Sequence, residues 1–192
     1  KKINGRFTNE INLSIKEVIN SGYYLFGKRT EEFENEFANF CGVRNCIAVG
    51  NGLDALKLIL QALQIGLGDE VILPANSFIA TALAVSSTGA KPVFIEPDES
   101  TFNIDSRLIE KSISSKTKAI IVVHLFGQIA NMEKIQIIAK KYNLKIIEDS
   151  ADTIGYKFNG DNTGRYSDVV TNSFYASHII NGGGTGGIVC FN

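Results

Sequence analysis

The pattern of apolar and polar residues along the chain changes near residue 46. From there on, short continuous apolar runs alternate with longer segments whose apolar residues recur every three or four positions. Such runs are typical of strands buried on both faces, and the longer period is typical of amphipathic helices. The predicted strands are 46–49, 71–73, 92–95, 119–123 and 144–148, and the predicted helices are 52–63, 77–87, 105–113 and 132–142. This alternation predicts an α/β fold with a mostly parallel sheet and helices on both faces.

The N-terminal region has a different pattern. A polar and apolar helix candidate covers residues 10–20, and a loop bracketed by glycines covers residues 21–27. The loop carries Tyr23, Tyr24 and Phe26. Loop aromatics pack under a neighbouring element more often than they bind a ligand, so the loop alone identifies no site.

A second N-terminal helix is predicted after this loop. Phe33, Phe37 and Phe40 lie at helical spacing on one face of it, which predicts core contacts for all three. We therefore divide the chain into an N-terminal helix with an aromatic loop, residues 1–30, and a large domain, residues 31–192.

Composition excludes several classes of protein. The chain has 192 residues, 44% of them apolar, and a net charge of -1, so no basic surface is expected for nucleic acid or an anionic membrane. No apolar run approaches the roughly 20 residues of a membrane span. Three cysteines without paired spacing predict a reducing, cytoplasmic location and neither a disulfide framework nor a zinc site. A start without Met and an end directly after a strand suggest a fragment.

Polar residues follow several predicted strands, where the ligands of parallel sheets bind. Gly50, Asn51 and Gly52 stand between a strand and a helix, so free backbone N–H groups there suit a phosphate as well as a plain tight turn. The spacing matches neither the dinucleotide fingerprint nor a Walker motif. Phe78 follows another strand and is placed either against a planar ligand or in the core.

Two acids, Glu148 and Asp149, end the strand 144–148. Carboxylates in this position are costly to bury unless a cation meets them. A metal is one candidate, but the two histidines, His124 and His178, add no ligand spacing, so no metal site is predicted.

The last predicted strands flank a serine, a histidine and a glycine-rich run. Ser173 ends one strand, His178 follows five residues later, and the glycine loop 182–187 leads into the strand 188–190. Glycines remove side-chain bulk and leave room for a large flat ligand close to the backbone, although a plain turn between strands is the simpler interpretation of this segment alone.

These motifs together resemble the DegT/DnrJ/EryC1/StrS sugar aminotransferase family, which depends on pyridoxal phosphate and has the aspartate aminotransferase-like fold. The resemblance rests on the segments 21–24, 52–56, 68–74, 148–149 and 173–175. It implies the large domain of a fold type I enzyme without its C-terminal small domain. It also implies a homodimer that acts on a nucleotide-linked keto sugar.

The resemblance assigns roles to particular residues. The amides of Gly52 and Leu53 and the hydroxyl of Ser173 would hold the cofactor phosphate, Phe78 would stack on the ring, and Asp149 would pair with the pyridine nitrogen.

Two positions depart from the family pattern. The lysine that forms the Schiff base is replaced by His178, and the usual Gln or His is replaced by Asp152, which we include among the cofactor-binding residues. Both changes resemble the 4-keto-6-deoxy-sugar 3-dehydratases, so we expect pyridoxamine 5'-phosphate or pyridoxal 5'-phosphate to be held without a covalent bond. His178 would then be the catalytic base for loss of the C3 hydroxyl.

Two alternatives stay open. One is a sugar-nucleotide aminotransferase that takes its amino group from a donor such as glutamate. The other is a non-catalytic sugar-nucleotide-binding or regulatory protein on the same fold. For the dehydratase, a reductase partner or an iron-sulfur cluster beyond Asn192 would decide the fate of the product.

Overall fold

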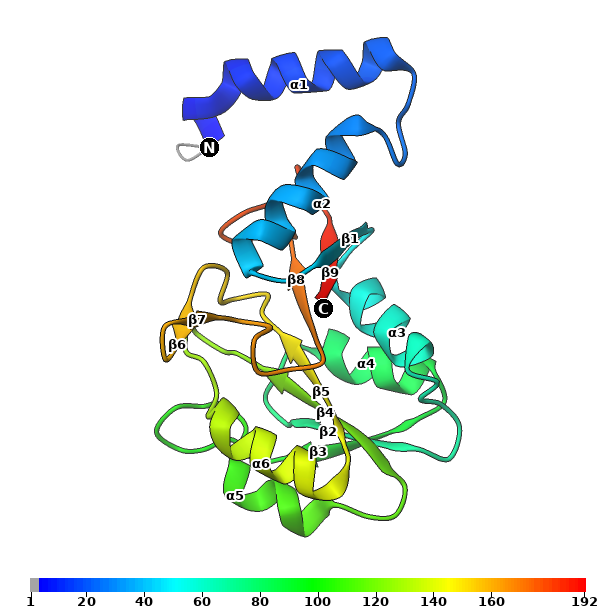
Figure 1. The fold of residues 1–192 in the computed structure, drawn as a ribbon, viewed down its shortest axis with the longest axis vertical. Coiled ribbons are helices and arrows are strands. Elements are labelled where there is room, and N and C mark those ends of the chain that lie inside the picture. The colour runs from blue at the N-terminus through cyan, green and yellow to red at the C-terminus, as the bar shows by residue number, and fades with distance from the viewer. Residues whose placement is uncertain (1–3) are drawn as a thin grey trace.

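A computed structural model describes residues 4–192, and a seven-stranded sheet is its centre (Figure 1). The strand order is β1-β9-β8-β5-β4-β2-β3. The strands of this sheet are β1 (Asn45–Val49), β2 (Glu70–Pro74), β3 (Lys91–Ile95), β4 (Thr117–Val123), β5 (Lys145–Asp149), β8 (Val169–Ser173) and β9 (Gly187–Phe191). A small antiparallel hairpin, β6 (Lys157–Phe158) and β7 (Asp161–Asn162), lies in the connection between β5 and β8. The sequence pattern did not predict this hairpin.

The sheet is mostly parallel, as predicted. The β2–β3, β2–β4, β4–β5 and β5–β8 pairs are parallel, and the β8–β9 and β9–β1 pairs are antiparallel. Parallel pairing brings the carboxyl ends of β2, β4, β5 and β8 to one edge, which is where the predicted site residues stand.

Helices cover both faces of the sheet, and strand alternation divides the core accordingly. On one face, α3 (Gly52–Ala62) and α4 (Ile79–Ser87) pack over side chains that include Leu73, Ile121 and Ile147. On the other face, α5 (Ser106–Ile109) and α6 (Met132–Tyr142) pack over the adjacent residues of the same strands, whose side chains point the opposite way. These residues include Ile72, Ile120 and Ile146. This arrangement explains why the strand sequences are apolar without interruption.

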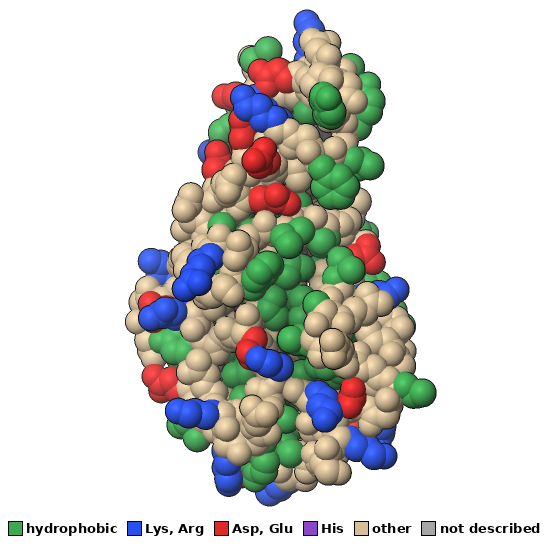
Figure 2. All heavy atoms as spheres, turned by 45° about the vertical axis from the view of Figure 1, so that its right-hand side comes forward, with side chains coloured by type: hydrophobic (Ala, Val, Ile, Leu, Met, Phe, Trp, Pro, Cys, Tyr) green, Lys and Arg blue, Asp and Glu red, His purple; other side chains and the backbone are tan. Residues whose placement is uncertain are grey.

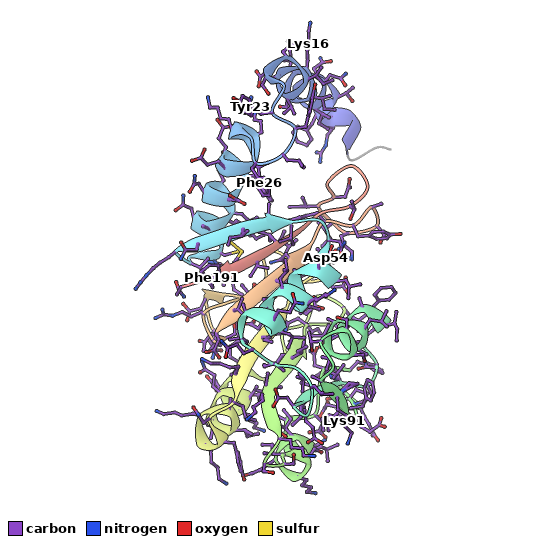
Figure 3. The ribbon with its side chains drawn as sticks, turned by 90° about the vertical axis from the view of Figure 1, so that its right-hand side faces the viewer. Lys16, Tyr23, Phe26, Asp54, Lys91 and Phe191 are labelled. Atoms are coloured by element: carbon purple, nitrogen blue, oxygen red, sulfur yellow. A yellow bond between two sulfur atoms is a disulfide. The ribbon has the colours of Figure 1, made fainter. Side chains whose placement is uncertain are left out.

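The N-terminal helices lie apart from most of this core. A short 3-10 helix, η1 (Asn4–Phe7), leads into α1 (Thr8–Ser21), which has no buried residue and projects from the body of the molecule (Figure 1). Figure 3 shows Tyr23 and Phe26 on the segment between α1 and α2 (Lys28–Cys41). Tyr23, Tyr24 and Phe26 are all exposed, with Phe26 at 89%. They therefore do not pack under a neighbouring element within this chain.

Several local predictions need correction. Phe37 is buried and Phe33 is partly buried in a third core cluster, where α2 packs on β1, β8 and β9. Phe40 is 50% exposed because it lies at the rim of this cluster, in contact with the Phe37 ring. The strand β1 is an edge strand with Ile47 exposed, not a buried strand. The helix predicted over residues 105–113 is the single turn α5 followed by the 3-10 turn η2 (Glu110–Ser112).

The expectation of unpaired cysteines is also wrong. Cys46 and Cys190 stand opposite each other in the register of β1 and β9 and form a disulfide, with Cα atoms 4.2 Å apart. Sequence spacing missed the pair because 144 residues separate the two cysteines. Cys41 is free and buried, and burial raises the pKa of its thiol to about 12, so the thiol stays protonated at neutral pH.

No helix between residues 4 and 192 combines the length and the apolar character that crossing a membrane requires.

Candidate functional site

The turn after β1 leaves two backbone donors free. Asn51 caps α3: its Oδ1 accepts from the N–H of Asp54 at 2.8 Å, and its Nδ2 donates to the Asp54 carboxylate at 2.7 Å. The N–H of Ala55 donates to the Asn51 carbonyl as the first helical bond. Among the described residues, none accepts from the N–H of Gly52 or Leu53. Two donors at a positive helix end are available to an anion.

Ser173 and Gly187 close this turn from the side of the sheet. Ser173 is the last residue of β8 and pairs with Gly187, the first residue of β9. A Cβ atom at Gly52 would lie 2.9 Å from the Ser173 Cβ, and one at Gly187 would lie 2.5 Å from the Asn51 carbonyl. Both glycines are therefore required by close approach of the backbone, and the Ser173 hydroxyl is brought next to the two free N–H groups.

The crowding at Gly52 gives a first testable prediction. Gly52→Ala should lower the free energy of unfolding by about 1–3 kcal/mol and weaken phosphate binding at the turn, because the methyl group must displace Ser173. Calorimetry with pyridoxamine phosphate and a thermal melt measure the two effects. Gly184→Ala is the matched control, because nothing lies within 4 Å of its added Cβ. Equal affinity in the two variants would contradict the assignment of the turn.

His178 is held by two bonds to its own loop. Its backbone N–H donates to the Tyr175 carbonyl at 2.9 Å, and its Nδ1 lies 2.9 Å from the Ser173 carbonyl. A carbonyl only accepts, so Nδ1 carries the proton, and in the neutral ring Nε2 keeps its lone pair. The loop returns on itself through the bonds from the Phe174 N–H to the Gly186 carbonyl and from the Gly182 N–H to the Phe174 carbonyl. The ring of His178 is thereby fixed beside Ser173.

Asp149 lies at the end of β5 on the same face of the sheet as Ser173. Strand alternation puts Asp149 on the face of Ile147 and Ser173 on the face of Val169, and both of those residues belong to the core under α3 and α4. Burial raises the pKa of the Asp149 carboxyl, and the N–H of Ala151, which donates to it at 3.2 Å, opposes that rise. A partly buried, desolvated carboxyl with one weak donor is suited to a cationic partner.

The remaining predicted residues take different positions. Phe78 follows β2 as the N-cap of α4 and is 77% exposed, so it lies at the same edge of the sheet and not in the core. Asp152 is exposed, and its charge adds to the rise in the Asp149 pKa. Asp54, which bonds to the capping residue Asn51, lies at the start of α3, and Tyr23 in the loop before α2 lies away from it (Figure 3). No metal-binding group of three or more His, Cys, Asp or Glu side chains occurs in residues 4–192.

One polar pair near the site was missed by sequence reasoning. The His124 Nε2 and the Glu148 Oε2 lie 2.7 Å apart, fully buried. The two residues are 24 positions apart in sequence, so the pair can be predicted only when β4 and β5 are known to be neighbours in this register. From the sequence we expected a cation beside Glu148. The structure places the N–H group of the His124 imidazole there instead.

A phosphorylated pyridine cofactor fits these groups. The free N–H groups of Gly52 and Leu53 with the Ser173 hydroxyl match the acceptors of a phosphate, and the partly buried Asp149 carboxyl matches a ring nitrogen that carries a proton.

Comparisons with known proteins point the same way. The profile of the DegT/DnrJ/EryC1/StrS aminotransferase family matches residues 6–192. A curated relative, the dTDP-3-amino-3,6-dideoxy-alpha-D-galactopyranose transaminase of Aneurinibacillus thermoaerophilus, is 50% identical over 192 residues, which are 100% of this chain and 53% of the relative. The chain therefore spans about half the length of the curated relatives it matches.

Solved structures agree with the fold. The crystal structure of S. venezuelae DesV in complex with a ketimine intermediate has a TM-score of 0.95 at 40% identity, over 98% of this chain and 51% of that one. The structure of NtdA from Bacillus subtilis with bound cofactor PMP has a TM-score of 0.91 at 36% identity, over 96% of this chain and 41% of that one.

Proposed function

This chain belongs to the DegT/DnrJ/EryC1/StrS aminotransferase family, and from that premise we propose that the whole protein transfers an amino group to a nucleotide-linked keto sugar. The observation that carries this proposal is the 50% identity to a named dTDP-amino-sugar transaminase. The family is dependent on pyridoxal phosphate, which as pyridoxamine phosphate supplies an amino group and an electron sink when bound. An amino donor such as glutamate would restore the amino group.

Different residues of the chain are proposed to contact different parts of the cofactor. The free Gly52 and Leu53 N–H groups and the Ser173 hydroxyl would bind the phosphate, and the exposed Phe78 would cover the ring. The Asp149 carboxylate holds a proton on the ring nitrogen through a charge-assisted hydrogen bond, worth about 1.5–3 kcal/mol. These contacts orient the cofactor without a covalent bond, since His178 stands where the resemblance places the lysine.

A second candidate, removal of the C3 hydroxyl of a 4-keto-6-deoxy sugar, is favoured by one observation. The His178 Nδ1–H is held by the Ser173 carbonyl, so in the neutral ring Nε2 is the atom that can accept a proton. In amino transfer this atom would take a proton from a carbon of the bound reactants and return it to a carbon of the sugar. In dehydration it would take the same proton and give one to the C3 oxygen, which leaves as water. The names of the relatives support amino transfer and give no support to dehydration, which the sequence alone placed first.

One experiment separates the candidates. The full-length protein is incubated with pyridoxamine phosphate and dTDP-, CDP- or GDP-linked 4-keto-6-deoxy sugars, and the products are identified by mass spectrometry. Exchange of the carbonyl oxygen for an amino group supports amino transfer, and loss of water supports dehydration. Tight binding of cofactor and sugar without either product would overturn both and leave the binding-protein alternative.

We also propose that the whole protein is a homodimer. Helix α1 has no buried residue, and Ile11, Ile15 and Ile19 form an exposed stripe at four-residue spacing along it. Figure 2, which brings the side of α3 and α4 forward, shows more apolar side chains across the middle of that face. Exposed apolar surfaces of this kind are typical of subunit interfaces.

The stripe on α1 provides a test of assembly. Ile15→Asp should weaken the dimer at least about tenfold, because an unpaired carboxylate would be buried at the interface. Analytical ultracentrifugation of the full-length protein measures the change, with the exposed Lys16→Glu as control. A parent protein that sediments as a monomer at micromolar concentration would refute the dimer.

A further inference from the structure

A buried His–Glu pair lies on the opposite face of β5 from the proposed cofactor contacts. His124 follows β4 directly, and Glu148 precedes Asp149 in β5. Their side chains are 0% and 1% exposed, and the Nε2–Oε2 distance is 2.7 Å. Because successive side chains of a strand alternate, Glu148 points toward the α6 face and Asp149 toward the α3 face. None of the binding contacts proposed above uses this pair.

The hydrogen bonds around the imidazole fix its tautomer. The N–H of Ala130 donates to His124 Nδ1 at 3.3 Å, so Nδ1 carries no proton. The ring proton therefore sits on Nε2 and is donated to the Glu148 carboxylate. The second oxygen of Glu148 accepts from the N–H of Gly164 at 2.9 Å. With Nδ1 accepting from Ala130 and both Glu148 oxygens accepting N–H groups, the hydrogen bonds match a neutral imidazole beside a carboxylate.

The same histidine also holds the backbone of Asp149. The N–H of His124 donates to the Asp149 carbonyl at 3.1 Å, while its ring holds the preceding residue. The end of β5 is thus attached to β4 through both the main chain and a side chain. A buried network in which every polar atom has a partner admits one arrangement and gives a rigid support.

We propose that His124 and Glu148 are positioning residues for Asp149, which fix its carboxylate against the ring nitrogen of a pyridine cofactor and supply a second negative charge that favours the protonated ring. This inference rests on the cofactor binding proposed above. A buried anion one residue away, in a medium of low dielectric constant, stabilises a cation at the Asp149 carboxyl. The pair itself contacts neither cofactor nor substrate in this role.

Glu148→Gln removes this support with little change of shape. If the amide oxygen accepts from His124, the amide nitrogen faces the N–H of Gly164. If the amide is turned, its nitrogen faces the protonated Nε2 of His124. The ring proton must then move to Nδ1, where it meets the N–H of Ala130. Either orientation sets two donors against each other and also removes the charge.

The test compares two ligands of the full-length protein by calorimetry. One is pyridoxamine phosphate, and the other is its analogue with a C–H group in place of the ring nitrogen. The parent should prefer the natural ligand by about tenfold to a hundredfold, the size of one charge-assisted hydrogen bond. In Glu148→Gln this preference should fall by about fivefold or more. A merely structural role would lower both affinities together and leave their ratio unchanged.

Controls make each outcome decisive. Glu34→Gln should keep the full preference, because the partly buried Glu34 accepts one backbone N–H, from Ala48 at 2.7 Å, at the edge strand β1, which β9 and β8 separate from β5. If Glu148→Gln does not fold, His124→Gln replaces it, since that variant keeps a donor toward Glu148 and loses the contact with Ala130. An undiminished preference in the folded variant overturns the positioning role alone. A parent that binds neither ligand overturns the cofactor binding, and this proposal with it.

Discussion

His178→Asn should retain cofactor binding and lose the exchange of a carbon-bound proton of pyridoxamine phosphate with deuterated solvent in the presence of sugar nucleotide. The amide nitrogen of asparagine can still donate to the Ser173 carbonyl, as His178 Nδ1 does, but no basic atom replaces Nε2. The loss of a general base lowers a rate by about 10²–10⁴-fold. Proton NMR of the bound or recovered cofactor follows the exchange, and calorimetry follows binding.

A lysine at the same position should reverse the mode of binding. His178→Lys presents an amine from the same loop, so borohydride treatment of the pyridoxal phosphate complex should fix the cofactor covalently, whereas the parent should release it on dialysis. Mass spectrometry of the intact protein measures the mass added by the cofactor, with Ile180→Val in the same loop as control.

For His178→Asn, proton exchange that continues undiminished would assign the base to another group.

Asp149→Asn should lower turnover by about 10²–10³-fold, the usual cost of removing one electrostatic contact to developing charge. Asparagine keeps the shape of the side chain but removes the charge that holds a proton on the ring nitrogen. Steady-state kinetics with saturating cofactor measure the loss. Asp152→Asn is the comparison, since it removes an exposed carboxylate nearby and should cost less than about tenfold.

The stability of cofactor-free Asp149→Asn provides an independent check that the variant folds. Burial raises the pKa of Asp149 in the folded protein. Its contribution to the free energy of unfolding is therefore greatest below the ordinary pKa of 3.8 and declines as pH rises through the raised value. Asparagine removes that decline, so the melting temperature at neutral pH should stay equal or increase. A marked decrease together with lost turnover would indicate damage to the fold.

Local sequence patterns determined the large elements because the physical causes are local. Continuous apolar runs specify strands that are buried on both faces, and the segments between them have helical periodicity. The positions of the candidate site residues Gly52, Ser173, Asp149 and Phe78, at or just after the ends of strands, were predictable for a related reason. In a parallel sheet, residues that directly follow strands reach the same edge whatever the order of the strands.

Other features depend on which strands are neighbours, and only the tertiary structure decided them. The Cys46–Cys190 disulfide requires β1 beside β9, and the His124–Glu148 pair requires β4 beside β5 in one register. The exposure of Phe40 depends on which side of α2 the core cluster covers, since Phe37 and Cys41 of the same helix are buried. Residues 24 or 144 positions apart interact only after the chain has folded, because hydrogen bonds and disulfides act over a few ångströms of space. No spacing rule along the sequence contains that information.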